Sequence, residues 1–338
     1  MLEIEQKIRE VFARKKVVIV GDLVADQYLS GTIDRVSREA PVFILRHDQT
    51  VTVAGAAANA AANVASLGGQ AVAVGLVGTD ANATQLIGKL MSAGVDTQFV
   101  ISDGGLATTT KVRILAGQKH AVRQQVIRVD YENTTAISPQ LRGRLIQNLR
   151  SATEDADAII VSDYNYGVAD ATLFNEARQI AEQRHIPITV DSRFRLAEFV
   201  GATSATPNQE EVEQLLGKGF TSGDCEALRE RSNFDALLVT NGSKGMLLVE
   251  RGLPPLQIDA VGSPEAVDVT GAGDTVIAVY SLGLASGLNF ADAAKIANLA
   301  GGLVVMKKGT AMISADELIR SLRGNAIELR AGEAVREN

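Results

Sequence analysis

Residues 268–274 combine glycines and carboxylates in a pattern suited to phosphoryl transfer. They read Asp-Val-Thr-Gly-Ala-Gly-Asp and run into an apolar stretch at residues 275–284, which predicts a tight turn that opens a helix. The first N–H groups of a helix lack partners and can hold an anion, which Gly271 and Gly273 would let approach closely. Asp274 could then accept the proton of a bound hydroxyl. The same pattern is also an ordinary helix start.

A second segment, residues 54–68, reads as a glycine turn followed by a helix of unusually small residues. Asn59 and Asn63 are one helical turn apart, so they share a face of that helix. Small side chains permit close packing, and amide groups both donate and accept hydrogen bonds. We expect the two asparagines to face a polar partner.

Carboxylates follow two of the predicted strands. Asp22 and Asp26 come after the strand predicted at residues 17–20, and Asp163 follows the strand predicted at residues 158–161. Open α/β sheets bind ligands at this edge, and carboxylates accept hydrogen bonds from sugar hydroxyls. Acids that simply face solvent are the alternative.

Asn208 and Glu211 are three residues apart, and so lie on one face of the helix predicted at residues 208–216. One helical turn could direct both toward a hydrated Mg²⁺. The same spacing is that of a capping box, with Asn208 as the N-cap and Glu211 as its partner. Both interpretations stand at this stage.

Apolar, β-branched runs alternate with helical segments along the chain. Strands are predicted at residues 17–20, 71–74, 158–161, 188–190 and 236–239, and helices at 56–67, 83–93, 139–152, 171–183, 208–216 and 291–306. This alternation predicts a mostly parallel sheet with helices on both faces. Residues 28–53 and 98–129 break the rhythm with runs rich in Val, Ile and Thr, which predict a small inserted β-sheet.

The composition is that of an acidic globular protein. The 338 residues are 46% hydrophobic and 22% charged, with a net charge of -7 and a pI near 5.2. No basic stripe predicts nucleic-acid binding, and no apolar run is long enough to predict a membrane span. The single cysteine, Cys225, fits a reducing compartment, and residues 1–16 lack a signal-peptide core. We therefore expect a cytoplasmic protein.

Several other enzyme classes lack their signatures. The chain has no Gly-x4-Gly-Lys-Ser/Thr and no strand followed by Gly-x-Gly-x-x-Gly, so neither a P-loop nor a dinucleotide site is predicted. The histidines His47, His120 and His185 are too scattered to indicate a metal cluster or a catalytic triad.

The motifs occur together in an order that resembles the ribokinase-like, or PfkB, carbohydrate kinases. Within that family the chain is most similar to the D-glycero-D-manno-heptose 7-phosphate kinases of lipopolysaccharide precursor synthesis. The resemblance extends over nearly the whole chain. The segments that carry it are residues 21–28, 35–42, 55–68, 127–130, 162–164, 206–211, 240–245 and 268–274.

The resemblance implies a single ribokinase-like domain over residues 1–338, with a three-layer αβα core and a β lid formed by about 28–53 and 98–129. It implies ATP and Mg²⁺ as cofactors, a monovalent cation such as K⁺, and a homodimer through the lid. The substrate would be a small sugar or sugar phosphate. Asp274 would be the catalytic base. The N–H groups of Gly271, Ala272 and Gly273 would stabilise the charge that develops on the transferred phosphoryl group.

The other implied site residues fall into three groups. The sugar would be bound by Asp22, Asp26, Gly55, Asn59, Arg128, Asp163 and Arg193. The nucleotide would be bound by Asn208, Thr240, Gly242, Gly245 and Asn298, with Lys308 near its end. Glu211 would hold Mg²⁺ through water, and Asp268 and Thr270 would hold the monovalent cation.

Three positions depart from the heptose kinase pattern. Tyr166 stands where Lys is usual, Ser192-Arg193 replaces Pro-Lys, and Arg38 replaces Pro. A lost Lys weakens a phosphate site, although Arg193 or Arg38 could restore the cation because guanidinium binds phosphate well. The alternatives are a PfkB-type kinase of another sugar, sugar acid or nucleoside, and a non-catalytic sensor of sugars or nucleotides.

Overall fold

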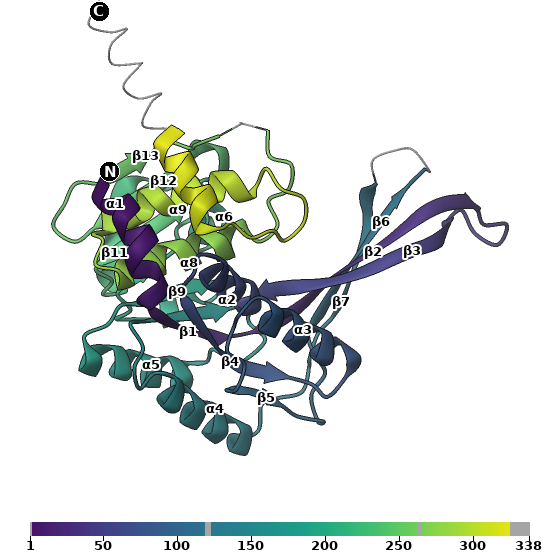
Figure 1. The fold of residues 1–338 in the computed structure, drawn as a ribbon, viewed down its shortest axis with the longest axis horizontal. Helices are drawn as coiled ribbons and strands as arrows, with labels where there is room; N and C mark the ends of the chain where they lie inside the picture. Colours follow the sequence, from purple (N-terminus) through teal and green to yellow (C-terminus); the bar gives the residue numbers. More distant parts are fainter. Residues whose placement is uncertain (1, 119–122, 263–264, 325–338) are drawn as a thin grey trace, which may run out of the picture.

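The computed structural model describes residues 2–118, 123–262 and 265–324, and its centre is a nine-stranded sheet (Figure 1). The strand order is β13-β12-β11-β10-β9-β8-β1-β4-β5. All neighbours from β11 to β5 pair in parallel, whereas β12 and β13 are antiparallel. The strands are β1 Lys16–Gly21, β4 Gln70–Val77, β5 Val100–Ser102, β8 Ala158–Asp163, β9 Ile188–Ser192, β10 Ser204–Ala205, β11 Ala236–Thr240, β12 Met246–Glu250 and β13 Leu256–Ile258.

Helices cover both faces of this sheet and make the three layers that the sequence predicted. One face carries α2, α3, α8 and α9, and the other carries α4 to α7. The helices are α1 Leu2–Gln6, α2 Ala57–Ser66, α3 Ala81–Ser92, α4 Pro139–Ala152, α5 Ala171–Arg184, α6 Gln209–Leu216, α7 Ser222–Arg231, α8 Ala272–Ala285 and α9 Phe290–Val304, and residues 315–324 are also helical.

The alternation of side chains along each strand divides the core into two halves. Along β1, Val17 and Ile19 pack on the side of α2 and α8, while Val18 and Val20 pack on the side of α4 and α5. A strand covered on both faces must be apolar at every position, which explains why the continuous apolar runs predicted these strands correctly.

Helix α8 is buried on every side. It packs against α2, α9 and strands β8 and β9, and every residue from Asp274 to Gly283 is buried. A helix that is apolar all round is expected in this position. Its first turn therefore places Asp274 in surroundings of low polarity.

A second sheet of four strands stands apart from the core in the order β3-β2-β6-β7 (Figure 1). It is the lid. Its strands are β2 Leu23–Val36, β3 Phe43–Ala56, β6 Thr110–Gly117 and β7 Gln124–Tyr131. β2 follows β1 after one residue, and β3 ends where α2 begins, so both strands reach from the core out to the far tip of the lid.

The lid boundaries differ from the predicted ranges in two ways. β5 was expected in the lid, but it pairs with β4 at the edge of the main sheet. The lid was expected to begin at about residue 28, but β2 begins at Leu23, so Asp26 lies within the lid, opposite Val53 of β3 and Lys111 of β6. β-branched residues suit either sheet, so composition alone did not separate β5 from the lid. Residues 119–122, with His120, lie outside the described residues.

The two faces of the lid differ in chemistry. The strand register places Asp26, Tyr28, Lys111, Arg113, Arg128 and Asp130 on one face. The opposite face carries apolar side chains from β6 and β7, among which Ile127 is 54% exposed and Val129 36% exposed. The charged face turns toward the core, because the Lys111 ammonium lies over the rings of Tyr164 and Tyr166 in the loop after β8. No described helix is both long and apolar enough to cross a membrane.

The junction between β3 and α2 is strained. Ala56, the residue before α2, has φ 55° and ψ -132°, a combination that only glycine adopts at low cost. The neighbouring Ala57 donates its N–H to the carbonyl oxygen of Asp22 at 3.2 Å, which fixes this end of the helix to the core. The surrounding contacts therefore hold Ala56 in an unfavourable conformation.

We expect Ala56→Gly to stabilise the fold by about 1 kcal/mol, since relief of backbone strain of roughly 1–3 kcal/mol exceeds the entropy cost of glycine. Chemical denaturation of the purified protein measures the change. Ala58→Gly, inside α2 and fully buried, is the matched control and should lose about 1 kcal/mol or more. Equal destabilisation by both substitutions would contradict the assigned strain.

Candidate active site

Asp274 lies in the first turn of α8 and is held at both carboxylate oxygens. The Asn59 amide donates to Oδ2 at 2.8 Å, and the Tyr164 hydroxyl donates to Oδ1 at 2.9 Å. The side chain is only 3% exposed. Burial raises the pKa of Asp274 to about 7, and the two hydrogen bonds oppose a larger rise. A carboxyl group with a pKa near neutrality is well matched to proton transfer.

The orientation of Asn59 follows from its other hydrogen bonds. The Asn63 amide donates to Asn59 Oδ1 at 3.1 Å, and the Thr275 hydroxyl donates to Asn63 Oδ1 at 3.2 Å. Because Asn59 accepts through its oxygen, its NH₂ group must point to Asp274. The polar partner expected for the two asparagines is thus Asp274, whose carboxylate Asn59 holds. A direct contact between Asn59 and the sugar stays a prediction.

The glycine turn before Asp274 forms a cradle. Gly271 has φ +78°, and a Cβ there would lie 2.6 Å from Asn59 Nδ2, so only glycine fits. A Cβ on Gly273 would have nothing within 4 Å, because this residue lines a cavity. Among the described residues, the N–H groups of Gly271 and Gly273 have no protein acceptor. The Ala272 N–H, expected to share in anion binding, instead donates to the Val269 carbonyl oxygen at 3.3 Å.

Asp22 has a different role from the one predicted. Its carboxylate accepts the backbone N–H groups of Tyr164, Tyr166 and Val168 at 2.8, 3.1 and 3.1 Å. The residue is 2% exposed, so three amide donors compensate the buried charge. Asp22 therefore holds the loop after β8. The sequence could not show this, because the donors lie far along the chain.

Asp163 was predicted to bind the sugar, and the structure contradicts this. The side chain is fully buried, forms an ion pair with Arg195 at 2.5 Å, and accepts the Ser192 hydroxyl at 2.7 Å. It ties the end of β8 to the loop after β9 and has no exposed surface to offer a ligand.

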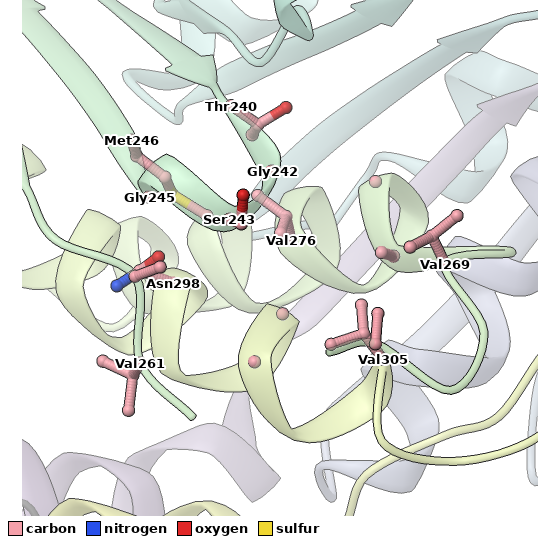
Figure 2. A pocket seen from close by; sticks show the side chains of 16 residues that line it. Thr240, Gly242, Ser243, Gly245, Met246, Val261, Val269, Val276, Asn298 and Val305 are labelled. Carbon is pink, nitrogen blue, oxygen red and sulfur yellow. The ribbon is translucent and has the colours of Figure 1, made fainter. Parts of the chain in front are cut away.

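An apolar slot of about 200 Å³ opens beside the glycine turn (Figure 2). Val261, Val276 and Val305 supply apolar walls, and the polar groups are few. The slot brings together four of the predicted nucleotide residues, which are Thr240, Gly242, Gly245 and Asn298. Such a slot suits a flat heterocycle, with Asn298 fixed by a hydrogen bond to the Asp259 carbonyl oxygen at 2.8 Å.

A second, more polar cavity of about 160 Å³ shares Thr240 and Gly273 with the slot. Its walls hold charged side chains. They are Asp191, Arg193 and Glu211, together with Tyr164, Thr206, Asn208 and Gly271. Arg193, predicted at a sugar phosphate, therefore lies beside the glycine cradle. The cavity extends from the apolar slot to Gly271, Gly273 and Tyr164, and the Tyr164 hydroxyl donates to Asp274.

Both interpretations of Asn208 and Glu211 find support in this cavity. The two residues form a capping box at the start of α6, with both hydrogen bonds at 2.9 Å. Burial raises the pKa of Glu211 to about 7, and the nearby Asp191 is likewise raised by burial and then by Glu211. Two facing carboxylates fit Mg²⁺, which binds oxygen ligands and keeps several waters. No larger cluster of metal-ligating side chains occurs among the described residues.

The charged face of the lid adds residues that sequence reasoning missed. The Lys111 Nζ lies 5.2 Å from the ring centroid of Tyr164 and 5.6 Å from that of Tyr166. Arg113 pairs with Asp26 at 3.3 Å. Burial lowers the pKa of Lys111 and raises that of Asp26. Alternation on β6 was the signal that could have identified both cations, because residues 111 and 113 share a face.

Other predicted sugar residues lie around this face. Arg128 pairs with Asp130 at 2.9 Å. Gly55 gives room to Asp26, since a Cβ there would lie 2.7 Å from Asp26 Oδ2. Arg38 instead lies in the loop between β2 and β3 at the outer tip of the lid, away from the base (Figure 1).

Asp268, predicted to bind a monovalent cation, ties two loops together. Its oxygens accept the backbone N–H groups of Thr270 at 2.9 Å and Gly309 at 3.0 Å. The next residue, Thr310, bonds the Tyr28 hydroxyl of the lid at 3.1 Å. This loop therefore connects the lid, Asp268 and the glycine turn, while the cation site stays a prediction.

Comparison with known proteins identifies the family. The sequence profile of the "pfkB family carbohydrate kinase" matches residues 14–317. The chain belongs to the PfkB carbohydrate kinases. It is therefore a phosphotransferase that acts on a sugar hydroxyl.

The PfkB chain is similar to the bifunctional protein HldE from two bacteria. It is 35% identical over 326 residues to that of Geobacter sulfurreducens and 37% identical over 315 residues to that of Caulobacter vibrioides. The matches cover 94% and 91% of this chain, but 65% and 63% of the two relatives. The chain thus spans slightly less than two thirds of their length.

Solved structures of other kinases share the ribokinase-like fold. Arabidopsis thaliana ribokinase, complexed with ribose and ATP, has a TM-score of 0.69 at 21% identity, over 91% of this chain and 98% of that one. Escherichia coli phosphofructokinase-2 with potassium has a TM-score of 0.73 at 18% identity, over 90% and 97%. At this identity the likeness shows the fold.

The raised pKa of Asp274 predicts a pH-dependent stability. Because the pKa rises from 3.8 to about 7 on folding, the folded protein binds the extra proton between these values. The contribution of Asp274 to the free energy of unfolding is therefore fully present below about pH 4. It decreases by about 4 kcal/mol as the pH rises through 7. Asp274→Asn should gain stability relative to the parent protein between pH 5 and pH 8.

Thermal unfolding at both pH values measures this difference. Asp316→Asn, on an exposed helical position, is the control and should change the difference little. An Asp274→Asn effect that is the same at pH 5 and pH 8 would show that the carboxylate is not destabilised by burial.

Proposed function

We propose that this PfkB chain is an ATP-dependent kinase in which Asp274 is the general base. One observation supports this most directly: the Asp274 carboxylate, held by two donors, stands in the helical turn whose glycines line both cavities. The apolar slot would take the adenine, and the polar cavity would take the phosphates. The γ-phosphate would then lie at the cradle, next to the base.

In this arrangement the base acts on the sugar hydroxyl, and the N–H groups of the glycine turn act on the phosphoryl group. Asp274 accepts the proton of the sugar hydroxyl as the hydroxyl oxygen attacks the γ-phosphorus. The free N–H groups of Gly271 and Gly273, with the N-terminus of α8, stabilise the charge on the transferred phosphoryl group. Arg193 adds a positive charge to the same cavity. Mg²⁺, held at Glu211 and Asp191, would neutralise the phosphate chain.

For the substrate we propose heptose 7-phosphate, phosphorylated at the anomeric hydroxyl, in lipopolysaccharide precursor synthesis. The similarity to HldE supports the sugar. The lid supports an anionic sugar, because Lys111 places a cation beside the rings of Tyr164 and Tyr166, and Arg113, paired with Asp26, lies beside Tyr28 on the same face. Tyr166 occupies the position where the heptose kinases usually have Lys, and the Lys111 ammonium lies 5.6 Å from the centre of its ring. A cation from the lid would thus replace the one missing from the loop.

The remaining proposals concern partners. The exposed apolar face of the lid, with Ile127 and Val129, supports the predicted homodimer through this sheet. The loop around Asp268 and Thr270 is where a K⁺ ion would bind. A kinase of another sugar, sugar acid or nucleoside is the second candidate, because Tyr166, Ser192 and Arg193 change the loops around the site.

A panel of phosphorylated and free sugars, assayed for ADP release with ATP and Mg²⁺, tests the kinase function. We expect heptose 7-phosphate to give the highest kcat/KM. Asp274→Asn should lower kcat by about 10²–10⁴-fold, since one general base supplies this much, and should leave ATP binding unchanged. No release with any sugar would favour a sensor. Full turnover in Asp274→Asn would exclude Asp274 as the base.

Lys111→Gln tests the contact with the substrate phosphate. It should lower kcat/KM for the phosphorylated sugar by about 10–100-fold, the worth of one charge-assisted hydrogen bond, and should change that for the free sugar little. Lys295→Gln, on the exposed side of α9, is the matched control. An equal loss on both sugars would indicate a structural role for Lys111.

A further inference from the structure

Tyr164 is a half-buried tyrosine that contacts the proposed base and has no role in the proposed mechanism. Its hydroxyl lies 2.9 Å from Asp274 Oδ1, and its ring lines the polar cavity. The Lys111 Nζ lies 5.2 Å from the centre of the same ring. Tyr164 therefore stands between the base, the phosphate cavity and the lid.

The direction of the bond between Tyr164 and Asp274 is fixed by chemistry. An ionised carboxylate only accepts hydrogen bonds, so the phenol must donate. Burial, followed by the charge of Asp274, raises the pKa of Tyr164 well above its ordinary value, so the phenol keeps its proton at neutral pH. Tyr164 is therefore a constant donor that stabilises the ionised form of Asp274.

The backbone of Tyr164 is as firmly held as its hydroxyl. Asp22 accepts its N–H at 2.8 Å and those of Tyr166 and Val168 as well. Asp22 in turn follows β1 at the centre of the sheet. Asp22 thus fixes the backbone of Tyr164, and the Tyr164 hydroxyl holds Oδ1 of Asp274. Asn59 of α2 holds Oδ2.

Charged groups act on Asp274 from the lid and from β9. Asp26 and Lys111 approach from the lid, and their charges act in opposite directions on Asp274. Asp191, at the end of β9, is close enough for its own pKa to be raised by Asp274. Among the residues that the structure describes, Asn59 and Tyr164 alone donate directly to the carboxylate. Loss of either donor therefore has a direct effect on the base.

We propose that Tyr164 is a positioning residue of the phosphoryl transfer, whose phenol fixes the plane of the Asp274 carboxylate and keeps it ionised until it takes a proton. This inference rests on the proposed role of Asp274. In the step, the sugar oxygen bonds to the γ-phosphorus, the bond from that phosphorus to the bridging oxygen breaks, and ADP leaves. The hydroxyl proton moves to Asp274, and Tyr164 neither gains nor loses one.

Tyr164→Phe tests the proposal, because it removes the hydroxyl and keeps the ring. The pH profile of kcat/KM should show its acid limb displaced upward by about one to two pH units, the effect of one hydrogen bond to a charged group. Activity at pH 6 should fall about tenfold or more, and the deficit should shrink above pH 9. A ¹³C titration of the Asp274 carboxyl carbon in the full chain without ligands should show the same displacement.

Tyr280→Phe is the matched control. Tyr280 is a buried tyrosine of α8, the helix that carries Asp274, and its hydroxyl pairs with Ser204 at 3.0 Å. It should lower thermal stability and leave the acid limb in place. A uniform loss in Tyr164→Phe with an unmoved limb, or a displaced limb in both variants, would overturn the proposal.

The two experiments separate this inference from the proposed function. If the parent protein transfers phosphate to no sugar, the proposed kinase function fails. The carboxyl titration then still decides whether Tyr164 acts on Asp274. An Asp274 titration that is identical in the parent protein and in Tyr164→Phe would overturn the inference, whatever the activity.

Discussion

A carboxylate buried at the start of a buried helix is the constraint on which the site depends. Removing Asp274 from water is costly, and the fold offsets the cost only in part, with two hydrogen-bond donors and the positive end of α8. The remaining penalty raises the pKa of Asp274 to about 7. The destabilisation of the ionised group is thus what suits Asp274 to the proposed role of base at neutral pH.

The rest of the structure explains why this carboxylate is well ordered. Asn59 is oriented by Asn63, and Tyr164 is oriented through the backbone that Asp22 holds. Asn59 and Tyr164 belong to different parts of the fold: α2 lies on one face of the sheet, and the loop with Tyr164 follows the carboxyl end of β8. A displacement of either element would open one side of the base. The small residues of α2 serve the same end by letting it pack closely against α8.

The sequence predicted those parts whose signal is local. Apolar runs predicted the parallel strands, because a strand buried on both faces must be apolar at every position. The glycine turn predicted Asp274, because a helix start and its carboxylate are adjacent in the chain. Asp22 and Asp163 were misjudged, since their partners are backbone amides and an arginine that only folding brings near. Lys111, Tyr164 and Asp191 were missed for the same reason.

The continuity of β3 with α2 has a mechanical consequence. A single 14-residue strand runs from the lid tip to Ala56, and the helix that carries Asn59 begins at the next residue. No linker residue separates β3 from α2, so the two elements are mechanically coupled at a point close to Asp274. A tilt of the lid must therefore rotate the first residues of α2. The distance between the Asn59 amide and the Asp274 carboxylate would then change with the position of the lid.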